Sequence, residues 1–143
     1  MWNLTVGGTL AIVFAFLLGR SVIELFRASA STEWLQVDGE VFQARMVRTA
    51  RRGWLPDIRY TYRLGDKEFI GRRLAFGREY WHFKGAGERA VARHPAGRAV
   101  TVYVHPHRAT LCVLEPGVRW FNYANVGYTA LLLGCIVAFV LFR

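Results

Sequence analysis

The chain has 143 residues, a formal net charge of +9 at pH 7 and a hydrophobic content of 53%. This length suits a single folded unit, but one small soluble core does not need so many apolar residues. The excess lies at the two ends of the chain, which excludes an ordinary soluble globular domain. Two cysteines do not make a disulfide framework, so a small disulfide-rich secreted protein is also excluded.

An uncharged apolar run extends from Trp2 to Gly19, and a second extends from Tyr123 to Phe142. As α-helices the two runs are about 27 and 30 Å long, close to the thickness of a bilayer core. A soluble protein would need a much larger chain to bury them. The sequence therefore predicts two transmembrane helices, the first within residues 2–27 and the second within residues 119–142.

A cleaved signal peptide is the alternative for the first run, because Ala28-Ser29-Ala30 has the small-x-small form of a cleavage site. The residues before the run include no Lys or Arg, and charged residues separate the run from the candidate site. We therefore expect a retained helix. Residues 20–27 continue it as an amphipathic extension through the interface, and the small residues of 28–33 are expected to form a hinge.

Three strands are predicted after the hinge. Residues 35–48 are typical of one long strand that is bulged near Gly39. Residues 58–64 alternate apolar and polar side chains with a period of two, which indicates a second strand. Gly65-Asp66 then turns the chain into a third strand over residues 67–76, which gives a hairpin.

A short helix over residues 85–94, ended by Pro95, is expected next. The alternating valines of 100–104 and the apolar run at 111–114 predict two more strands. Residues 34–117 are thus expected to form a β-rich extramembrane domain. The predicted fold class is a membrane protein of the α+β type, in which two transmembrane helices flank a small, mainly antiparallel domain of about five strands and one short helix.

Small residues recur every four positions in both predicted spans. Such stripes let helix backbones approach closely, and packing then drives association in the bilayer. They predict that the spans pack on each other, on a second copy or on a partner. The predicted packing positions are Gly7, Ala11, Ala15 and Gly19 in the first span and Ala130, Gly134 and Ala138 in the second.

No catalytic or metal site is predicted. His105-Pro106-His107 is the most site-like cluster, but no Cys or carboxylate cluster supplies further ligands, so exposed turn histidines are expected. Cys112 alternates with apolar neighbours and is expected to be a buried structural thiol. The serines lie near the first span without the G-x-S-x-G context of a nucleophile. We expect a non-enzymatic protein without a cofactor.

Basic side chains gather in the middle of the domain and predict either a surface for an anionic partner or a solvated sheet face. A domain tethered at both ends meets lipid headgroups first, and each nearby cation contributes on the order of 1 kcal/mol. Nucleic acid is the least favoured partner, because no recognition motif accompanies the charge. The predicted basic face consists of Arg48, Arg51, Arg52, Arg59, Arg63, Arg72 and Arg73.

The stretch REYWHFK at residues 78–84 mixes aromatic and basic side chains. This mixture suits the headgroup layer of a membrane and also suits stacking on nucleobases. Tethering to a bilayer favours lipid or a membrane protein, and the remaining alternative is that Trp81 and Phe83 cap the core of the sheet. The predicted interface residues are Arg78, Tyr80, Trp81, Phe83 and Lys84.

Four short motifs follow one another in the domain. They are Pro56, Ile58, Tyr60 and Tyr62 in one strand, Gly65 and Gly71 in the hairpin, Pro95-Ala96-Gly97 before a valine-rich strand, and Leu114-Glu115-Pro116-Gly117 before the second span. This order resembles a bacterial two-pass membrane family catalogued as domain of unknown function 3592. The resemblance implies a membrane-anchored small β domain and no assigned activity, and it places REYWHFK in a variable connection.

Together these patterns predict a non-enzymatic two-pass membrane protein that binds a partner as an accessory or assembly subunit of a membrane complex. The alternative is an immunity-type or regulatory membrane protein that neutralises an acidic toxin or enzyme. Expected partners are anionic lipid headgroups and a membrane protein or second copy. The expected location is the bacterial inner membrane. Every charged side chain except Arg143 lies between the spans, which favours a cytoplasmic loop domain.

Overall fold

The computed structural model of the protein describes residues 2–50, 53–77 and 84–141. The chain divides into two compact units, of which one combines the residues up to Arg27 with those from Val118 onward, and the other is Ala28–Gly117. The elements in chain order are α1 (Trp2–Ala30), η1 (Ser31–Glu33), β1 (Leu35–Thr49), β2 (Gly53–Leu64), β3 (Lys67–Gly71), α3 (Lys84–Arg93), β4 (Ala99–His105), β5 (Arg108–Val113) and α4 (Trp120–Leu141).

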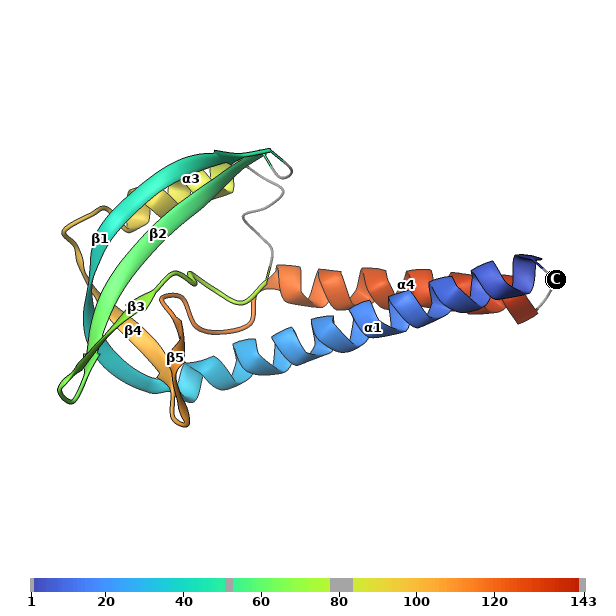
Figure 1. The fold of residues 1–143 in the computed structure, drawn as a ribbon, viewed down its shortest axis with the longest axis horizontal. Coiled ribbons are helices and arrows are strands. Elements are labelled where there is room, and N and C mark those ends of the chain that lie inside the picture. Colours follow the sequence, from blue (N-terminus) through green and yellow to red (C-terminus); the bar gives the residue numbers. More distant parts are fainter. Residues whose placement is uncertain (1, 51–52, 78–83, 142–143) are drawn as a thin grey trace. The chain divides into compact units, whose positions relative to one another are not determined.

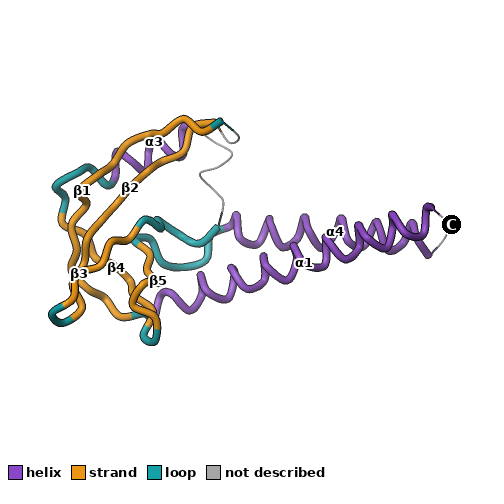
Figure 2. The backbone as a smooth tube through the Cα atoms, in the orientation of Figure 1, coloured by secondary structure: helices purple, strands orange, loops and turns teal. Residues whose placement is uncertain are grey.

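The helices α1 and α4 have the length and apolar composition needed to cross a membrane. Only 6% of the most apolar stretch of each helix is buried. A core helix of a soluble protein is mostly buried, so apolar side chains that point outward all round suit a lipid environment. The two helices converge toward one end (Figure 2), where they approach closely at Gly7 and an added Cβ would lie 2.6 Å from Cγ2 of Val140.

Residues 28–33, which were expected to form a hinge, are helical. α1 continues to Ala30, and the 3-10 turn η1 follows it directly. The Ala28 and Ser31 side chains are fully buried. The Ser31 hydroxyl donates to the Ala28 carbonyl at 2.7 Å and accepts from the N–H of Gly117 at 3.0 Å. Ala28 and Ser31 are therefore packing positions, and a hinge at residues 28–33 stays a prediction.

The β domain is a five-stranded antiparallel sheet in the order β3-β2-β1-β4-β5. β1 belongs to two parts of this sheet, because residues 35–40 pair with β4 while residues 39–49 pair with β2. The register shifts between Val41 and Gln43. The bulge therefore lies at Phe42, which confirms the bulge predicted near Gly39. An extra residue in one strand bends that strand, which suits the curved β1–β2 hairpin in Figure 1.

The two ends of the sheet order meet beyond β3 and β5. The N–H groups of Leu114 and Glu115 both donate to the carbonyl of Leu74, at 3.1 and 2.7 Å. β3 thus ends at Gly71, earlier than the predicted residue 76, because the chain leaves the ladder to make this contact. The sheet therefore curls around its own core.

The core lies inside the curled sheet and is covered by α3 at the β1–β2 hairpin (Figure 1). Alternate residues of β2 are buried in it, as the period of two predicted. The buried cluster consists of Val41, Ile58, Tyr60, Tyr62, Leu74, Ala86, Ala90, Val102, Val104, Cys112 and Leu114. Cys112 is only 3% exposed, which confirms the predicted buried thiol.

Two tyrosine hydroxyls donate hydrogen bonds to backbone carbonyls across this core. The Tyr60 hydroxyl donates to the Arg73 carbonyl at 2.7 Å and lies 3.3 Å from the sulfur of Cys112. The Tyr62 hydroxyl donates to the Ala109 carbonyl, which links β2 to β5. Burial, with a further contribution from Cys112, raises the pKa of both hydroxyls well above the usual range for tyrosine.

Replacing Gly71 by alanine is expected to destabilise the domain, because a Cβ at this position would lie 2.2 Å from the ring of Tyr60, its cross-strand partner. The expected loss is roughly 1–3 kcal/mol of unfolding free energy, measured by urea denaturation in mild detergent. Gly85→Ala is the matched control, since a Cβ at Gly85 would lie 3.7 Å from Nη1 of Arg89, an ordinary van der Waals distance. Equal unfolding midpoints for both variants would contradict this packing.

Stability is expected to fall at alkaline pH. Both tyrosines have a raised pKa in the folded state, so the unfolded chain ionises first, above about pH 10. The unfolding free energy stays level below this pH and then drops by up to about 1.4 kcal/mol per pH unit for each tyrosine. Urea unfolding between pH 8 and 11 measures the slope. The variant Tyr60→Phe/Tyr62→Phe should flatten it, and an unchanged slope would refute the assignment.

Candidate functional site

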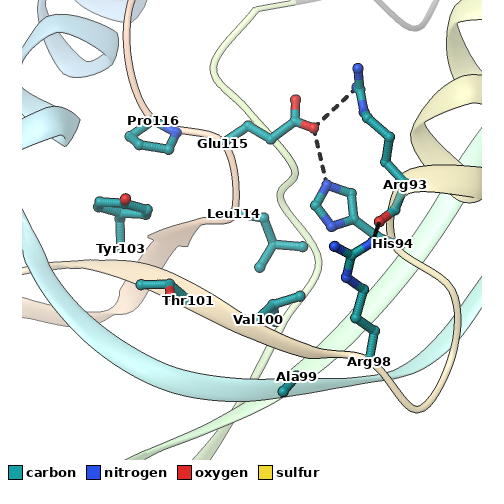
Figure 3. A pocket seen from close by; sticks show the side chains of 10 residues that line it. All are labelled: Arg93, His94, Arg98, Ala99, Val100, Thr101, Tyr103, Leu114, Glu115 and Pro116. Atoms are coloured by element: carbon teal, nitrogen blue, oxygen red, sulfur yellow. Dashed lines mark hydrogen bonds and ion pairs between the residues drawn. The ribbon is translucent and has the colours of Figure 1, made fainter.

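An open pocket of about 490 Å³ lies in the β domain where the end of α3, the start of β4 and the segment after β5 come together (Figure 3). Its lining combines charged, polar and apolar side chains, which is the composition expected of a small-ligand site. The lining residues are Arg93, His94, Arg98, Ala99, Val100, Thr101, Tyr103, Leu114, Glu115 and Pro116.

A tight turn brings the first half of this lining together. α3 ends at Arg93, and the N–H of His94 still donates to the Ala90 carbonyl at 3.2 Å. Pro95 then cannot continue the helix, and Gly97 adopts a φ of 84°, which favours glycine. The Gly97 N–H donates to the carbonyl of Val41 at 2.6 Å, so β1 holds the turn in place. Arg98 and β4 consequently begin beside the end of α3.

Glu115 joins this turn to the segment after β5. One oxygen of its carboxylate, Oε1, lies 3.1 Å from Nη2 of Arg93 and 3.0 Å from Nε2 of His94 (Figure 3). The Glu115 and His94 side chains are 14% and 16% exposed, whereas that of Arg93 is 52% exposed. The partly buried bond to His94 is therefore shielded from water, while solvent screens the ion pair with Arg93.

The ring of His94 has one further polar atom in the protein interior. Its Nδ1 is buried and has no hydrogen-bond partner among the described residues. When Nε2–H donates to the carboxylate of Glu115, Nδ1 of the neutral ring is an acceptor. His94 thus links the end of α3 to Glu115 through Nε2. Within the described ranges, no donor lies within hydrogen-bond distance of its Nδ1.

Arg98 is positioned by the same helix end. Its Nη1 donates to the carbonyl of Arg93 at 2.7 Å, which satisfies one of the last acceptors of α3. A guanidinium group carries five N–H donors, so this bond fixes the group and leaves a donor edge for another acceptor. The charged lining is thus two guanidinium groups and one carboxylate. The two guanidinium groups suit holding an anion.

The described arginines of the predicted basic face do not share one surface. Arg59 and Arg63 alternate with the buried tyrosines and lie on the outer face of β2. Asp57 on the same face accepts from Arg59 at 3.2 Å and lies 3.7 Å from Arg45. Arg63 stands opposite Glu68 in the register of β2 and β3. The outer face is therefore of mixed charge.

The other arginines of this set lie elsewhere. Arg48 pairs with Trp54, which lies on the same strand face as the buried Ile58, so Arg48 is on the opposite face from Arg59. Arg72 and Arg73 are exposed after β3, and the Arg73 guanidinium stands 5.1 Å from the ring centre of Phe76. Two members of the predicted face lie outside the described residues, namely Arg51 and Arg52.

Of the predicted interface stretch, Lys84 alone falls within the described residues. It begins α3, and its ammonium group lies 3.4 Å from the Glu88 carboxylate and 5.3 Å from the ring centre of Trp54. The remaining predicted interface residues lie outside the described ranges, namely Arg78, Tyr80, Trp81 and Phe83.

The two small-residue stripes differ in what they contact. In α1, Gly7 approaches Val140 and Ala11 is half-buried, whereas Ala15 and Gly19 are exposed. All three positions of the second stripe are exposed on α4, namely Ala130, Gly134 and Ala138. A Cβ added at Gly134 would meet no atom within 4 Å. The close helix contact therefore uses one end of the first stripe and leaves the second stripe uncovered.

Of the two histidines that were expected to be exposed in a turn, His107 is an exposed turn residue, whereas His105 is half-buried at the end of β4. Nδ1 of His105 accepts from the backbone N–H of His107 at 3.1 Å, and its ring packs edge-on against Trp34 with 5.0 Å between centroids. Among the described residues, no group of three or more His, Cys, Asp or Glu side chains is placed to hold a metal ion.

Sequence reasoning did not single out the pocket residues. The motifs around Pro95-Ala96-Gly97 and Leu114-Glu115-Pro116-Gly117 were the available signal, since Arg93, His94 and Arg98 flank the first and Glu115 belongs to the second. Neither motif indicates that the two lie close together in the fold. Their proximity results from the closure of the sheet at Leu74, which is not visible in the local sequence.

The model of the family described as "Domain of unknown function (DUF3592)" matches residues 37–119, which is more than half of the chain. The match begins within β1 and ends just before α4, so it includes the sheet closure and every residue that lines the pocket. A search of the curated proteins found no match, and a search of the solved structures found none either. The resemblance drawn from the four motifs is thus confirmed, and the chain belongs to the DUF3592 family.

Proposed function

We propose that the protein is a non-enzymatic two-pass membrane protein that acts as an accessory or assembly subunit of a membrane complex. In this proposal α1 and α4 are the membrane spans, and a face of α4 binds a helix of another membrane protein or of a second copy. The proposed location is a bacterial inner membrane, and the charge distribution along the chain favours a β domain in the cytoplasm.

The observation that carries the proposal is the contrast between two faces of α4. Thr129 is buried, and Leu132 and Ile136 are half-buried, so these positions mark the covered face. Gly134 lies roughly 160° around the helix from Leu132. It is exposed like Ala130 and Ala138, and a Cβ there would meet open space. A small-residue face that its own partner helix leaves uncovered suits close packing against a further helix.

The kind of partner follows from the chemistry of this face. α4 carries no charged side chain between Trp120 and Leu141, so an ion pair inside the bilayer does not select the partner. Close backbone approach and van der Waals packing would do so instead, which favours a partner helix with its own small residues at the contact. The alternative role, neutralising an acidic toxin or enzyme, depends on one continuous basic face. We do not carry it forward, because the described arginines lie on different surfaces.

Replacing Gly134 by leucine is expected to abolish the association, because a large side chain keeps the partner backbone at a distance. We expect at least a tenfold loss of the stoichiometric membrane partner, about 1.4 kcal/mol, after purification in mild detergent and quantitative mass spectrometry. Gly8→Leu is the matched control, since a Cβ at Gly8 of α1 also meets no atom within 4 Å. Undiminished recovery of the partner with Gly134→Leu, or purification of a bare monomer from the unaltered chain, would refute the proposal.

A further inference from the structure

The pocket at the end of α3 supports an inference that does not depend on the membrane-helix partner. We propose that this pocket binds the phosphate group of a small anionic ligand, which is either a lipid headgroup or a free phosphate compound.

The charge of the lining favours an anion. Arg93 and Arg98 bring two guanidinium groups to the pocket, and Glu115 brings its one carboxylate. That carboxylate repels an anion, but its Oε1 is already held within 3.1 Å by Arg93 and His94. The result is a lining with a net positive charge of one when His94 is neutral. Glu115 therefore acts to position Arg93 at the helix end and leaves an excess of positive charge for a ligand.

The geometry around Arg98 favours an oxyanion in particular. One nitrogen of the exposed Arg98 guanidinium donates to the Arg93 carbonyl at 2.7 Å, which favours one orientation of the planar group before a ligand arrives. A guanidinium fork pairs with phosphate through two parallel hydrogen bonds, which a freely rotating side chain makes at greater entropic cost. Thr101 and Tyr103 also line the pocket from β4 and add two hydroxyl groups that can donate to phosphate oxygens.

The charge and the size of the ligand follow from the same lining. A phosphate monoester carries a charge between about −1.5 and −2 at pH 7, so it is attracted by the excess positive charge of the lining more strongly than a single carboxylate is. The volume of about 490 Å³ exceeds what a bare phosphate ion fills. Ala99, Val100 and Leu114 line the remainder, so the pocket has apolar surface for the group that carries the phosphate.

Binding is tested on the full chain in a nonionic detergent by isothermal titration with inorganic phosphate and with glycerol phosphate, at constant ionic strength. A second arm uses nanodiscs of phosphatidylcholine with and without phosphatidic acid, whose headgroup is a phosphate monoester, and follows the thermal unfolding of the protein. We expect saturable binding in at least one arm. Binding in the detergent arm identifies a free phosphate compound, and stabilisation by phosphatidic acid alone identifies a lipid headgroup.

The decisive variant is Arg98→Gln, which should weaken the binding at least tenfold because the fork is lost. Arg108→Gln removes the same charge from the exposed end of β5, outside the pocket, and should change the affinity less than twofold. Thr101→Val removes a pocket hydroxyl but keeps the shape of the side chain at an exposed strand position, so it should not disturb folding. It should weaken binding several-fold, and it tests the proposal independently if Arg98→Gln folds poorly.

Gly134→Leu should leave phosphate binding intact, so this test stands apart from that of the helix partner. Absence of binding in both arms would overturn the proposal. So would binding that survives Arg98→Gln and Thr101→Val, or binding that Arg108→Gln weakens equally. In those cases the ion pairs at the pocket serve only to attach α3 to the closing segment.

Discussion

The architecture of the β domain depends on the carbonyl of Leu74, which accepts hydrogen bonds from the N–H groups of Leu114 and Glu115. These bonds join the segment that follows β3 to the segment that follows β5, the two strands at the ends of the sheet order. The neighbouring carbonyl of Arg73 accepts from the buried Tyr60 hydroxyl, so the same segment is held from inside the core. Closure and core packing thus stabilise one another.

The position of the pocket follows from this closure. When the N–H of Glu115 is held by Leu74, the Glu115 side chain reaches the end of α3 and meets Arg93 and His94. The turn after α3 is fixed separately, through the bond from Gly97 to Val41 of β1. Two independent backbone contacts, Glu115 to Leu74 and Gly97 to Val41, therefore bring the charged residues of the lining together. A lining built on fixed backbone is suited to binding, because little conformational freedom is lost when a ligand arrives.

Much of the fold could be predicted from local patterns, and the exceptions have physical causes. The alternation of Ile58, Tyr60 and Tyr62 reports a buried strand face directly, and the structure confirms it. The bulge predicted near Gly39 lies at Phe42. At Gly39 itself a Cβ would lie 2.6 Å from the Thr61 carbonyl oxygen, so glycine there permits close strand approach. Residues 28–33 were expected to form a hinge because several of them are small, and in the structure they are helical, with Ala28 and Ser31 buried as packing positions. Glycine and alanine suit both roles, and sequence alone does not separate them.

The candidate site was less predictable because it depends on register and closure. The extra residue at Phe42 inverts the alternation of β1, so Arg48 lies on the face of the core and not beside Arg59. The pairing of Asp57 with Arg45 and Arg59 likewise appears only once the strand register is known. His94 and Glu115 are far apart in the sequence, and only the closed sheet makes them neighbours.

The most direct test of the account is amide hydrogen exchange of the full chain in detergent micelles, followed by NMR. If the closure is integral to the fold, the amides of Leu114 and Glu115 will exchange only through global unfolding. Their opening free energies will then lie within about 1 kcal/mol of that of Val102, in the buried part of β4. Fast exchange of Leu114 and Glu115 while Val102 stays protected would show that the sheet opens locally, and it would contradict the account.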